Sequence, residues 1–170
     1  MRKVFIKSIL ISSLLLNIAV AQTCKDYIPD NNPNSRYTNH NDGTVTDNET
    51  GLMWKQCVEG LSGINACTSE EYTKHTWQQA LQLPSSVTFA TYNDWRLPNL
   101  TELESLVRQN CIYPSINISL FPNTPFFGVW SSSPDAPWYS GATFIVDFQE
   151  GLAGLNDRSS NFHVRLVRSR

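Results

Sequence analysis

The sequence predicts an α+β domain with short antiparallel strands, two helices and long loops, held together by disulfides. Three observations lead to this fold class. Short runs of alternating apolar and polar residues occur toward both ends of the chain, two amphipathic stretches lie between them, and the chain has four cysteines. A length of 170 residues suits a single domain with its own core.

Residues 1–21 have the pattern of a secretory signal peptide. Arg2, Lys3 and Lys7 give a positive start, and the apolar run that follows ends at Ala21, where we expect cleavage. That run is about a dozen residues long, short of the ~20 that a membrane-spanning helix needs. We therefore expect a secreted, periplasmic or cell-envelope protein without a membrane span after cleavage.

The predicted mature chain is acidic. The signal peptide carries three of the 13 Lys and Arg residues and none of the 15 Asp and Glu residues, so 10 basic residues remain against 15 acidic ones. Nucleic-acid binding needs a positive field that displaces counterions from phosphates. The charge balance argues against a nucleic-acid partner and leaves a glycan or a cell-surface protein as the expected partner.

All four cysteines lie after the predicted cleavage site, and an even number in an oxidising compartment indicates two disulfides. Three pairings are possible. The short separation favours a bond between Cys57 and Cys67, which leaves Cys24 with Cys111. Closing a loop of this size stabilises a fold by about 2–3 kcal/mol. A zinc site is disfavoured because the chain has no Cys-x-x-Cys pair.

The N-terminal half begins with a polar arm and a hairpin. Residues 22–35 are rich in Asn, Asp and Pro and lack an apolar period, so we expect an arm there and a domain over 36–170. The β-prone runs 44–47 and 52–55 flank a polar segment that ends in Gly51, which predicts a β-hairpin.

Two helices are expected next. The first covers 76–83, where apolar residues recur at helical spacing before Pro84 ends the run. The second begins after Asn99, a capping residue, with Glu102 three positions later as in a capping box. Its apolar face is formed by Leu100, Leu103, Leu106 and Val107.

The C-terminal half combines a long loop with strands. Between Cys111 and Val129, several prolines, asparagines and serines predict an irregular stretch, and long loops often carry binding residues. Alternation of apolar and polar residues predicts strands over 142–148 and 161–168. The intervening residues 149–160 suit a turn or one more short strand.

Seven short segments of the sequence together resemble those of a known protein family. In chain order they are Gly43–Asp47, Thr50–Trp54, Thr76–Trp77, Tyr92–Asn99 with Glu102–Leu103, Phe121–Thr124, Trp130–Ser133 and Val164–Arg168. Together they resemble the C-terminal domain of collagen-like adhesins, the Lcl C-terminal domain family, over about residues 36–170. The resemblance implies a bacterial envelope or secreted protein with a fold similar to C-type lectin-like and formylglycine-generating-enzyme-like domains. In the adhesins the domain is linked to attachment to sulfated glycans, but this sequence has no Gly-x-y collagen repeat before the domain.

The C-terminal arginines are the first candidate binding residues. Arg165 and Arg168 lie on the expected last strand, and guanidinium groups bind sulfate or carboxylate groups in a bidentate manner. A basic edge there could hold an anionic glycan. The alternative is that these arginines pair with Asp94, Asp147 or Glu150 inside the fold.

A second candidate site combines Trp138, Tyr139 and Ser132. Aromatic planes beside hydroxyl groups are typical of sugar sites, since the rings stack on apolar sugar faces and the hydroxyls set orientation. We expect Trp138 and Tyr139 to be exposed because a proline and a glycine flank them closely. Trp130, just before the serine run, can equally be a core residue.

One motif, Asn-Asp-Trp-Arg-Leu-Pro-Asn, allows two interpretations. Asn93, Asp94 and Asn99 could supply oxygens to Ca²⁺ or to a sugar. A calcium site needs 6–8 oxygens, so Ca²⁺ is at most a possible cofactor. In the structural interpretation, which we favour, Asp94 pairs with Arg96, Trp95 is buried and Asn99 caps the helix.

Catalysis has little support in the sequence. The three histidines occur in unrelated settings, without a His-Glu-x-x-His or Gly-x-Ser-x-Gly motif. A triad of Ser132, His163 and Asp147 is conceivable, but a serine-rich chain permits many such sets. We therefore expect an exported, adhesin-like binding module and not an enzyme, with no required cofactor. The alternatives are an enzyme on a lectin-like scaffold and a structural subunit of an envelope assembly.

Overall fold

The computed structural model describes residues 21–68, 71–134 and 141–169. Nearly all of the expected signal peptide, and the pair Trp138 and Tyr139, lie outside the described residues. Short strands with two short α-helices confirm the α+β class. In chain order the elements are β1 (Thr23–Cys24), the 3-10 helix η1 (Asn34–Arg36), β2 (Tyr37–Asn39), β3 (Thr44–Asp47), β4 (Leu52–Lys55), α1 (Trp77–Gln82), the 3-10 helix η2 (Leu83–Ser86), α2 (Leu100–Glu104), β5 (Cys111–Ile112), β6 (Gly128–Pro134), β7 (Ala142–Asp147), β8 (Leu152–Asp157) and β9 (Val167–Ser169).

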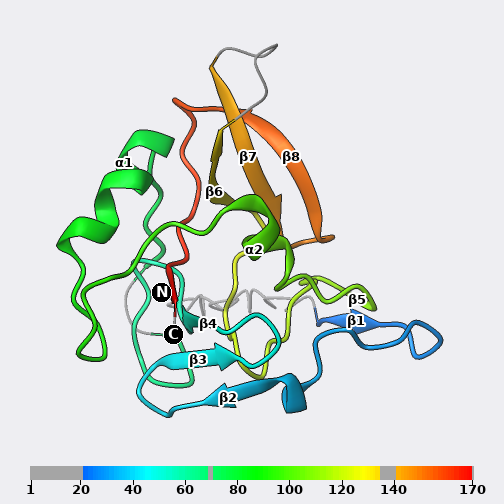
Figure 1. Cartoon of the computed structure of the whole chain (residues 1–170). Helices are drawn as coiled ribbons and strands as arrows, with labels where there is room; N and C mark the ends of the chain where they lie inside the picture. The colour runs from blue at the N-terminus through cyan, green and yellow to red at the C-terminus, as the bar shows by residue number, and fades with distance from the viewer. Residues whose placement is uncertain (1–20, 69–70, 135–140, 170) are drawn as a thin grey trace, which may run out of the picture.

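The strands of the described residues form three antiparallel sheets (Figure 1). One sheet has the order β2, β3, β4, β9, another has the order β6, β7, β8, and β1 pairs with β5. In Figure 1 the three-stranded sheet stands above the four-stranded one, with α1 to one side and α2 in contact with β6 and β7. The last strand returns to β4 and so closes the chain onto its first hairpin.

The predicted hairpin is confirmed as β3 and β4. Gly51 has a φ of 71°, a left-handed conformation that glycine adopts without strain, and its N–H donates to the carbonyl of Asp47 at 2.9 Å. The Asp47 carboxylate is buried and accepts two hydrogen bonds from Arg36. Burial opposes its ionisation, but these bonds hold the pKa of Asp47 below its usual value. This ion pair ties the start of β2 to the hairpin turn.

Both predicted helices are confirmed, and each begins with a capping box. Thr76 caps α1, and Asn99 caps α2 in a reciprocal arrangement with Glu102. The second helix is shorter than its apolar pattern suggested, since it ends at Glu104. Leu106 lies in the turn that follows and is still fully buried, so the apolar residues reach the core without a longer helix.

The loop and the middle of the C-terminal half also follow the prediction. Residues 113–127 form no helix and no strand apart from a single bridge at Ile116. Nearly all of 142–148 is β7, and residues 149–160 supply β8 at the edge of the same sheet.

The strand expected over 161–168 is wrong. Only Val167–Ser169 forms a strand, β9. Residues 163–167 are all buried, whereas a strand on a half-solvated sheet would alternate between buried and exposed. The segment instead runs through the interior from β6, where His163 makes a parallel bridge, to β4, which donates a hydrogen bond to the carbonyl of Leu166.

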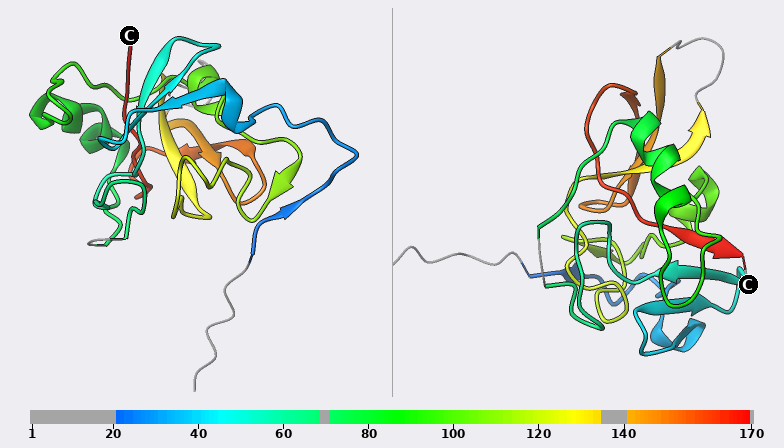
Figure 2. Two further views of the ribbon diagram at one scale, coloured as in Figure 1. Left: turned by 90° about the horizontal axis from the view of Figure 1, so that it is seen from below. Right: turned by 90° about the vertical axis from the view of Figure 1, so that its left-hand side faces the viewer.

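Both predicted disulfides are present. One joins Cys24 on β1 to Cys111 on β5, and the other joins Cys57 to Cys67 in the loop after β4. Figure 2 shows the arm projecting from one side of the domain, with β1 beside β5. Disulfides of this kind are typical of proteins that fold outside the reducing cytoplasm.

The core consists of two clusters of apolar side chains. One is centred on Trp54 and Phe121 and includes residues from both larger sheets. The other surrounds Trp95 and Trp130 and is covered by α1. Among the described residues, no helix is both long and apolar enough to cross a membrane.

Candidate functional site

A groove with a volume of about 1010 Å³ lies along the loop 113–127, which is at the upper end of the size range of small-molecule sites. Its other walls are Ala21 with the first residue of the arm, residues 71–74 and the buried segment after β8. Rings dominate its surface. The aromatic and proline side chains that line it are Tyr72, Tyr113, Pro114, Pro122, Pro125, Phe126 and Phe127.

The loop wall keeps its shape through local contacts. The rings of Tyr113 and Phe126 meet edge to face, with 6.4 Å between their centres. The Thr124 hydroxyl donates to the carbonyl of Phe121 at 2.8 Å and so closes a turn. Because prolines carry no N–H, this wall presents rings and few hydrogen-bond donors.

His163 is a buried polar residue of the groove, with 1% of its surface exposed. Its backbone is fixed, since its N–H donates to Gly128 and its carbonyl accepts from Trp130. Neither ring nitrogen has a partner among the described residues. Burial is the main cause that lowers the pKa of His163 to about 4; the charges of Lys74 and His75 act in the same direction, whereas the nearby backbone of Thr73 acts to raise it. The imidazole is therefore neutral at pH 7, with a free donor and a free acceptor.

Tyr72 and Lys74 form the mouth of the groove. The Tyr72 ring stands at 73° to the His163 ring, with centres 5.2 Å apart, and covers it. The Tyr72 hydroxyl donates to the carbonyl of Asn123 at 3.0 Å, which spans the groove from one wall to the other. The Lys74 ammonium lies 5.3 Å from the ring centre of Phe127, which is 61% exposed. We call His163, against which the Tyr72 ring packs, the groove floor.

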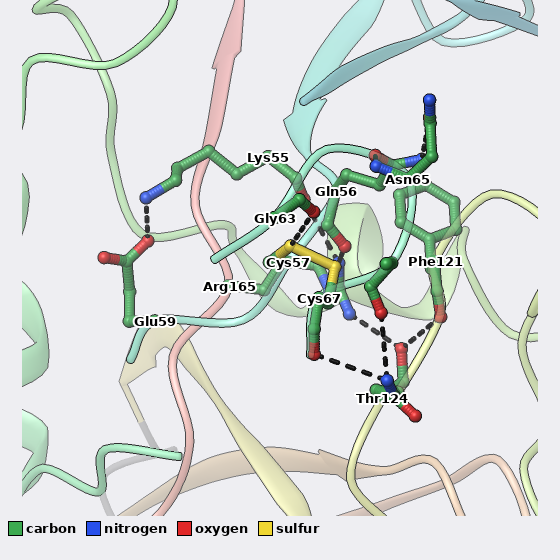
Figure 3. Close-up of a disulfide and its surroundings, with 12 residues drawn as sticks. Lys55, Gln56, Cys57, Glu59, Gly63, Asn65, Cys67, Phe121, Thr124 and Arg165 are labelled. Atoms are coloured by element: carbon green, nitrogen blue, oxygen red, sulfur yellow. Dashed lines mark hydrogen bonds and ion pairs between the residues drawn. A yellow bond between two sulfur atoms is a disulfide. The ribbon is translucent and has the colours of Figure 1, made fainter. Parts of the chain in front are cut away.

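Arg165, two positions after His163, is fully buried but has partners (Figure 3). Its Nη1 donates to the carbonyls of Lys55 and Gln56, and its Nη2 donates to the Thr124 hydroxyl at 2.8 Å. The guanidinium carbon lies 5.0 Å from the ring centre of Phe121. Burial lowers the pKa of Arg165 to about 9, so the group stays charged at pH 7. We call these contacts the Arg165 junction, which joins β4 to the groove wall.

The Cys57–Cys67 loop fastens the same wall from outside. The Asn123 side-chain amide donates to the carbonyls of Ala66 at 2.9 Å and Cys67 at 3.3 Å. Figure 3 shows the disulfide close to Arg165 and Thr124. The wall of the groove therefore depends on contacts from two distant parts of the sequence.

The structure separates the residues that the sequence suggested as a binding surface. Arg165 is in the interior, so the expected basic edge of Arg165 and Arg168 does not form. Arg168 pairs with Asp94 at 2.6 Å, one of the internal partners considered above, and its guanidinium lies 4.0 Å from the ring centre of Tyr92. Ser132 is on β6 and does not line the groove.

The motif around Trp95 is structural in its contacts, with one partner predicted wrongly. Asp94 pairs with Arg168 and not with Arg96, which instead binds Glu102 at 2.6 Å. Arg96 is better placed for the first turn of α2, whereas β9 brings Arg168 next to Asp94. Trp95 is 4% exposed, as predicted. No group of three His, Cys, Asp or Glu side chains within the described residues could hold a metal ion.

The conceivable triad does not come together. No hydrogen bond joins Ser132, His163 and Asp147, all three of which the structure describes. The Asp147 carboxylate instead accepts from the backbone N–H of Gln149 at 2.7 Å.

The fold and the site together define a class of protein: an α+β domain with two disulfides and a ring-lined groove along the loop 113–127. The chain belongs to the Lcl C-terminal domain family, whose model matches residues 43–168. This confirms the family resemblance seen in the sequence. A comparison with curated proteins finds no match.

Sequence reasoning pointed to the loop after Cys111 as a place for binding residues, and that loop supplies most of the groove. It missed Tyr72 and Lys74, and it considered His163 only as a member of a triad. The density of proline and aromatic residues over 113–127 was the available signal for a ring-lined wall. Nothing local in the sequence shows that 71–74 and His163 lie opposite that loop.

Proposed function

We propose that the protein is an exported, adhesin-like binding module that recognises a glycan, and that the groove is its ligand site. The supporting observation is the set of aromatic rings along the groove, to which Tyr72, Tyr113 and Phe127 contribute. Sugar rings have apolar C–H faces that stack on aromatic side chains, while polar groups such as the side-chain oxygen of Asn123 in the groove lining suit sugar hydroxyls.

Export is the second part of the proposal. The signal-peptide pattern over 1–21 and the two disulfides both support an oxidising compartment outside the cytoplasm. A scaffold similar to C-type lectin-like domains, implied by the family resemblance, would suit a site built on loops over short sheets. An enzymatic role gains no support from the described groove, where no nucleophile is hydrogen-bonded to His163.

A glycan array carrying neutral and sulfated oligosaccharides, with and without Ca²⁺, tests the proposed function on residues 22–170. The wild-type domain should bind a subset of the glycans, and Phe127→Ala should weaken this binding at least tenfold. Leu152→Ala is the matched control, because Leu152 has the same 61% exposure as Phe127 but lies on β8, away from the groove. A blank array, or equal losses in both variants, would contradict a glycan site in the groove.

A protein partner is the second candidate, and the edge strand β8 favours it. Leu152 and Leu155 are 61% and 41% exposed on this strand, and exposed apolar edge strands promote pairing with another chain. This observation agrees with a subunit of an envelope assembly. Light scattering at high protein concentration should then show association that Leu155→Glu abolishes, and a monomer at all concentrations would argue against self-assembly.

A further inference from the structure

His163 is the feature of the groove that packing does not explain. Four side-chain atoms within the described residues are buried without a hydrogen-bond partner: Trp54 Nε1, Arg165 Nε and both ring nitrogens of His163. Only His163 lines the groove. A buried polar atom without a partner destabilises a fold, so an apolar ring of similar size would serve packing better.

The chemistry of a neutral imidazole limits what can satisfy it. One ring nitrogen donates and the other accepts, so a matching ligand must offer an acceptor and a donor together. A hydroxyl group does both, and because the two ring nitrogens point away from each other, each would pair with a separate hydroxyl of the ligand. An anionic group would lack a positive partner at this depth, and burying an unpaired charge is more costly than burying a hydroxyl.

The charges around His163 agree with an uncharged ligand group. Lys74 lies at the mouth, over Phe127, and Glu71 lies on the same wall with the opposite sign. His75, the other titratable group nearby, holds its ring against the Thr73 hydroxyl at 3.0 Å. The guanidinium of Arg165 is taken up by carbonyls and a hydroxyl in the junction. Among the described residues, Lys74 is therefore the cation that lines the groove, and its ammonium is engaged with the exposed Phe127 ring at the mouth and not with the floor.

We propose, on the basis of the proposed function, that His163 is the specificity-determining residue of the groove and selects an uncharged, hydroxyl-bearing sugar ring over a sulfated one. His163 is 1% exposed and the Tyr72 ring packs edge to face against it, so we expect the Tyr72 side chain to turn aside when a ligand binds. Its hydroxyl makes one hydrogen bond within the described residues, to the Asn123 carbonyl, and the residue is 44% exposed. The Tyr72 ring can then stack on the bound sugar.

The test compares wild-type protein with His163→Phe and His163→Gln on the same array of neutral and sulfated oligosaccharides. Phenylalanine keeps the ring but removes both polar atoms, and glutamine keeps a donor and an acceptor. We expect His163→Phe to lose at least tenfold in apparent affinity for neutral oligosaccharides, and His163→Gln to retain binding within a few-fold. Wild-type binding should change less than twofold between low and high salt, because no ion pair forms.

Thermal melting of the same variants shows whether His163 has a merely structural role. Because it relieves two unpaired polar atoms, His163→Phe should melt higher than the wild type, by roughly 3–6 °C. If the wild type and His163→Phe bind equally well, the inference is wrong and the proposed function stands. If the wild type binds nothing on the array, both are wrong. A lower melting temperature shows that the imidazole is bonded inside the fold and also overturns the inference.

Discussion

The Arg165 junction and the groove floor place two basic side chains on the same buried segment, yet they differ in their partners. The terminal nitrogens of Arg165 donate to the carbonyls of Lys55 and Gln56 and to Thr124, and the ion is held in place. His163 has a fixed backbone and a ring with no partner in the described part of the chain. Burial alone therefore does not reveal the role of a polar residue, whereas hydrogen bonding does.

The two regions also depend on each other. Thr124 accepts a hydrogen bond from Arg165 and lines the groove, so the junction fixes the wall that faces His163. Arg165, whose two terminal nitrogens have partners, provides rigidity, and His163, whose ring nitrogens have none among the described residues, provides the ligand contact. Two residues of one segment therefore have different roles: Arg165 stabilises the site, and His163 is left available to bind the ligand.

Breaking the junction should have the largest effect on stability. Arg165→Met removes a buried cation and leaves the carbonyls of Lys55 and Gln56 without their donor, which we expect to cost about 3–5 kcal/mol of unfolding free energy. Denaturant unfolding followed by tryptophan fluorescence measures it. The control is Arg168→Met, because the Asp94 side chain that pairs with Arg168 is 55% exposed, and an ion pair with an exposed carboxylate should contribute little. Equal losses in the two variants would remove the distinction between them.

The second-largest expected effect is a loss of folding stability in acid, caused by His163 in the groove floor. The pKa of His163 is about 4 in the folded protein and 6.5 when unperturbed, so the unfolded chain binds more protons between these values. Stability should be fully present above pH 6.5 and fall as the pH drops toward 4, by up to about 3 kcal/mol. His163→Phe should lack this part of the pH profile, while the carboxylates Asp47 and Glu102, whose pKa values are lowered, act at lower pH in both proteins. Identical profiles above pH 5 would show that His163 titrates normally.

Removing the disulfide that supports the junction should have a somewhat smaller effect. Replacing Cys57 and Cys67 together by alanine should lower the free energy of unfolding by about 2–3 kcal/mol, mainly by freeing the unfolded chain. Since Asn123 binds carbonyls of this loop, array binding should weaken as well. Unchanged binding in the still-folded variant would show that the loop does not support the groove wall.

Tyr72→Phe should have the smallest effect. It removes the hydrogen bond to the Asn123 carbonyl at a partly exposed position, so we expect a loss of about 1 kcal/mol or less in calorimetric unfolding. The ring still covers His163, and with its tether gone it should turn aside more readily, leaving array binding equal or a few-fold tighter. A strong loss of binding would mean that the hydroxyl itself contacts the sugar.

Features set by neighbouring residues could be predicted from the sequence. The caps at Thr76 and Asn99, the hairpin turn at Gly51 and the local disulfide Cys57–Cys67 each depend on a few consecutive or closely spaced residues. These local features were sufficient for the α+β class and for the long loop.

Contacts between distant residues could not be predicted in this way. From the sequence, Asp94 could pair with either Arg96 or Arg168. The structure selects Arg168, because the pairing of β9 with β4 brings it next to Asp94. Apolar and polar residues alternate around Arg165, and this pattern predicted a strand. The same alternation occurs here in a segment that crosses the interior with all of residues 163–167 buried. The opposition of His163 to the loop 113–127 is likewise a product of the whole fold.

The most direct test of the account is the nitrogen NMR spectrum of the His163 ring in the folded protein, recorded from pH 7 to pH 4 and again with the neutral oligosaccharides of the array. We predict a neutral ring down to about pH 5, and a shift of its ring nitrogens when a neutral oligosaccharide binds. A ring that is protonated at pH 6, or nitrogen shifts that stay constant while the domain binds sugar, would contradict the claim that His163 is kept unpaired for the ligand.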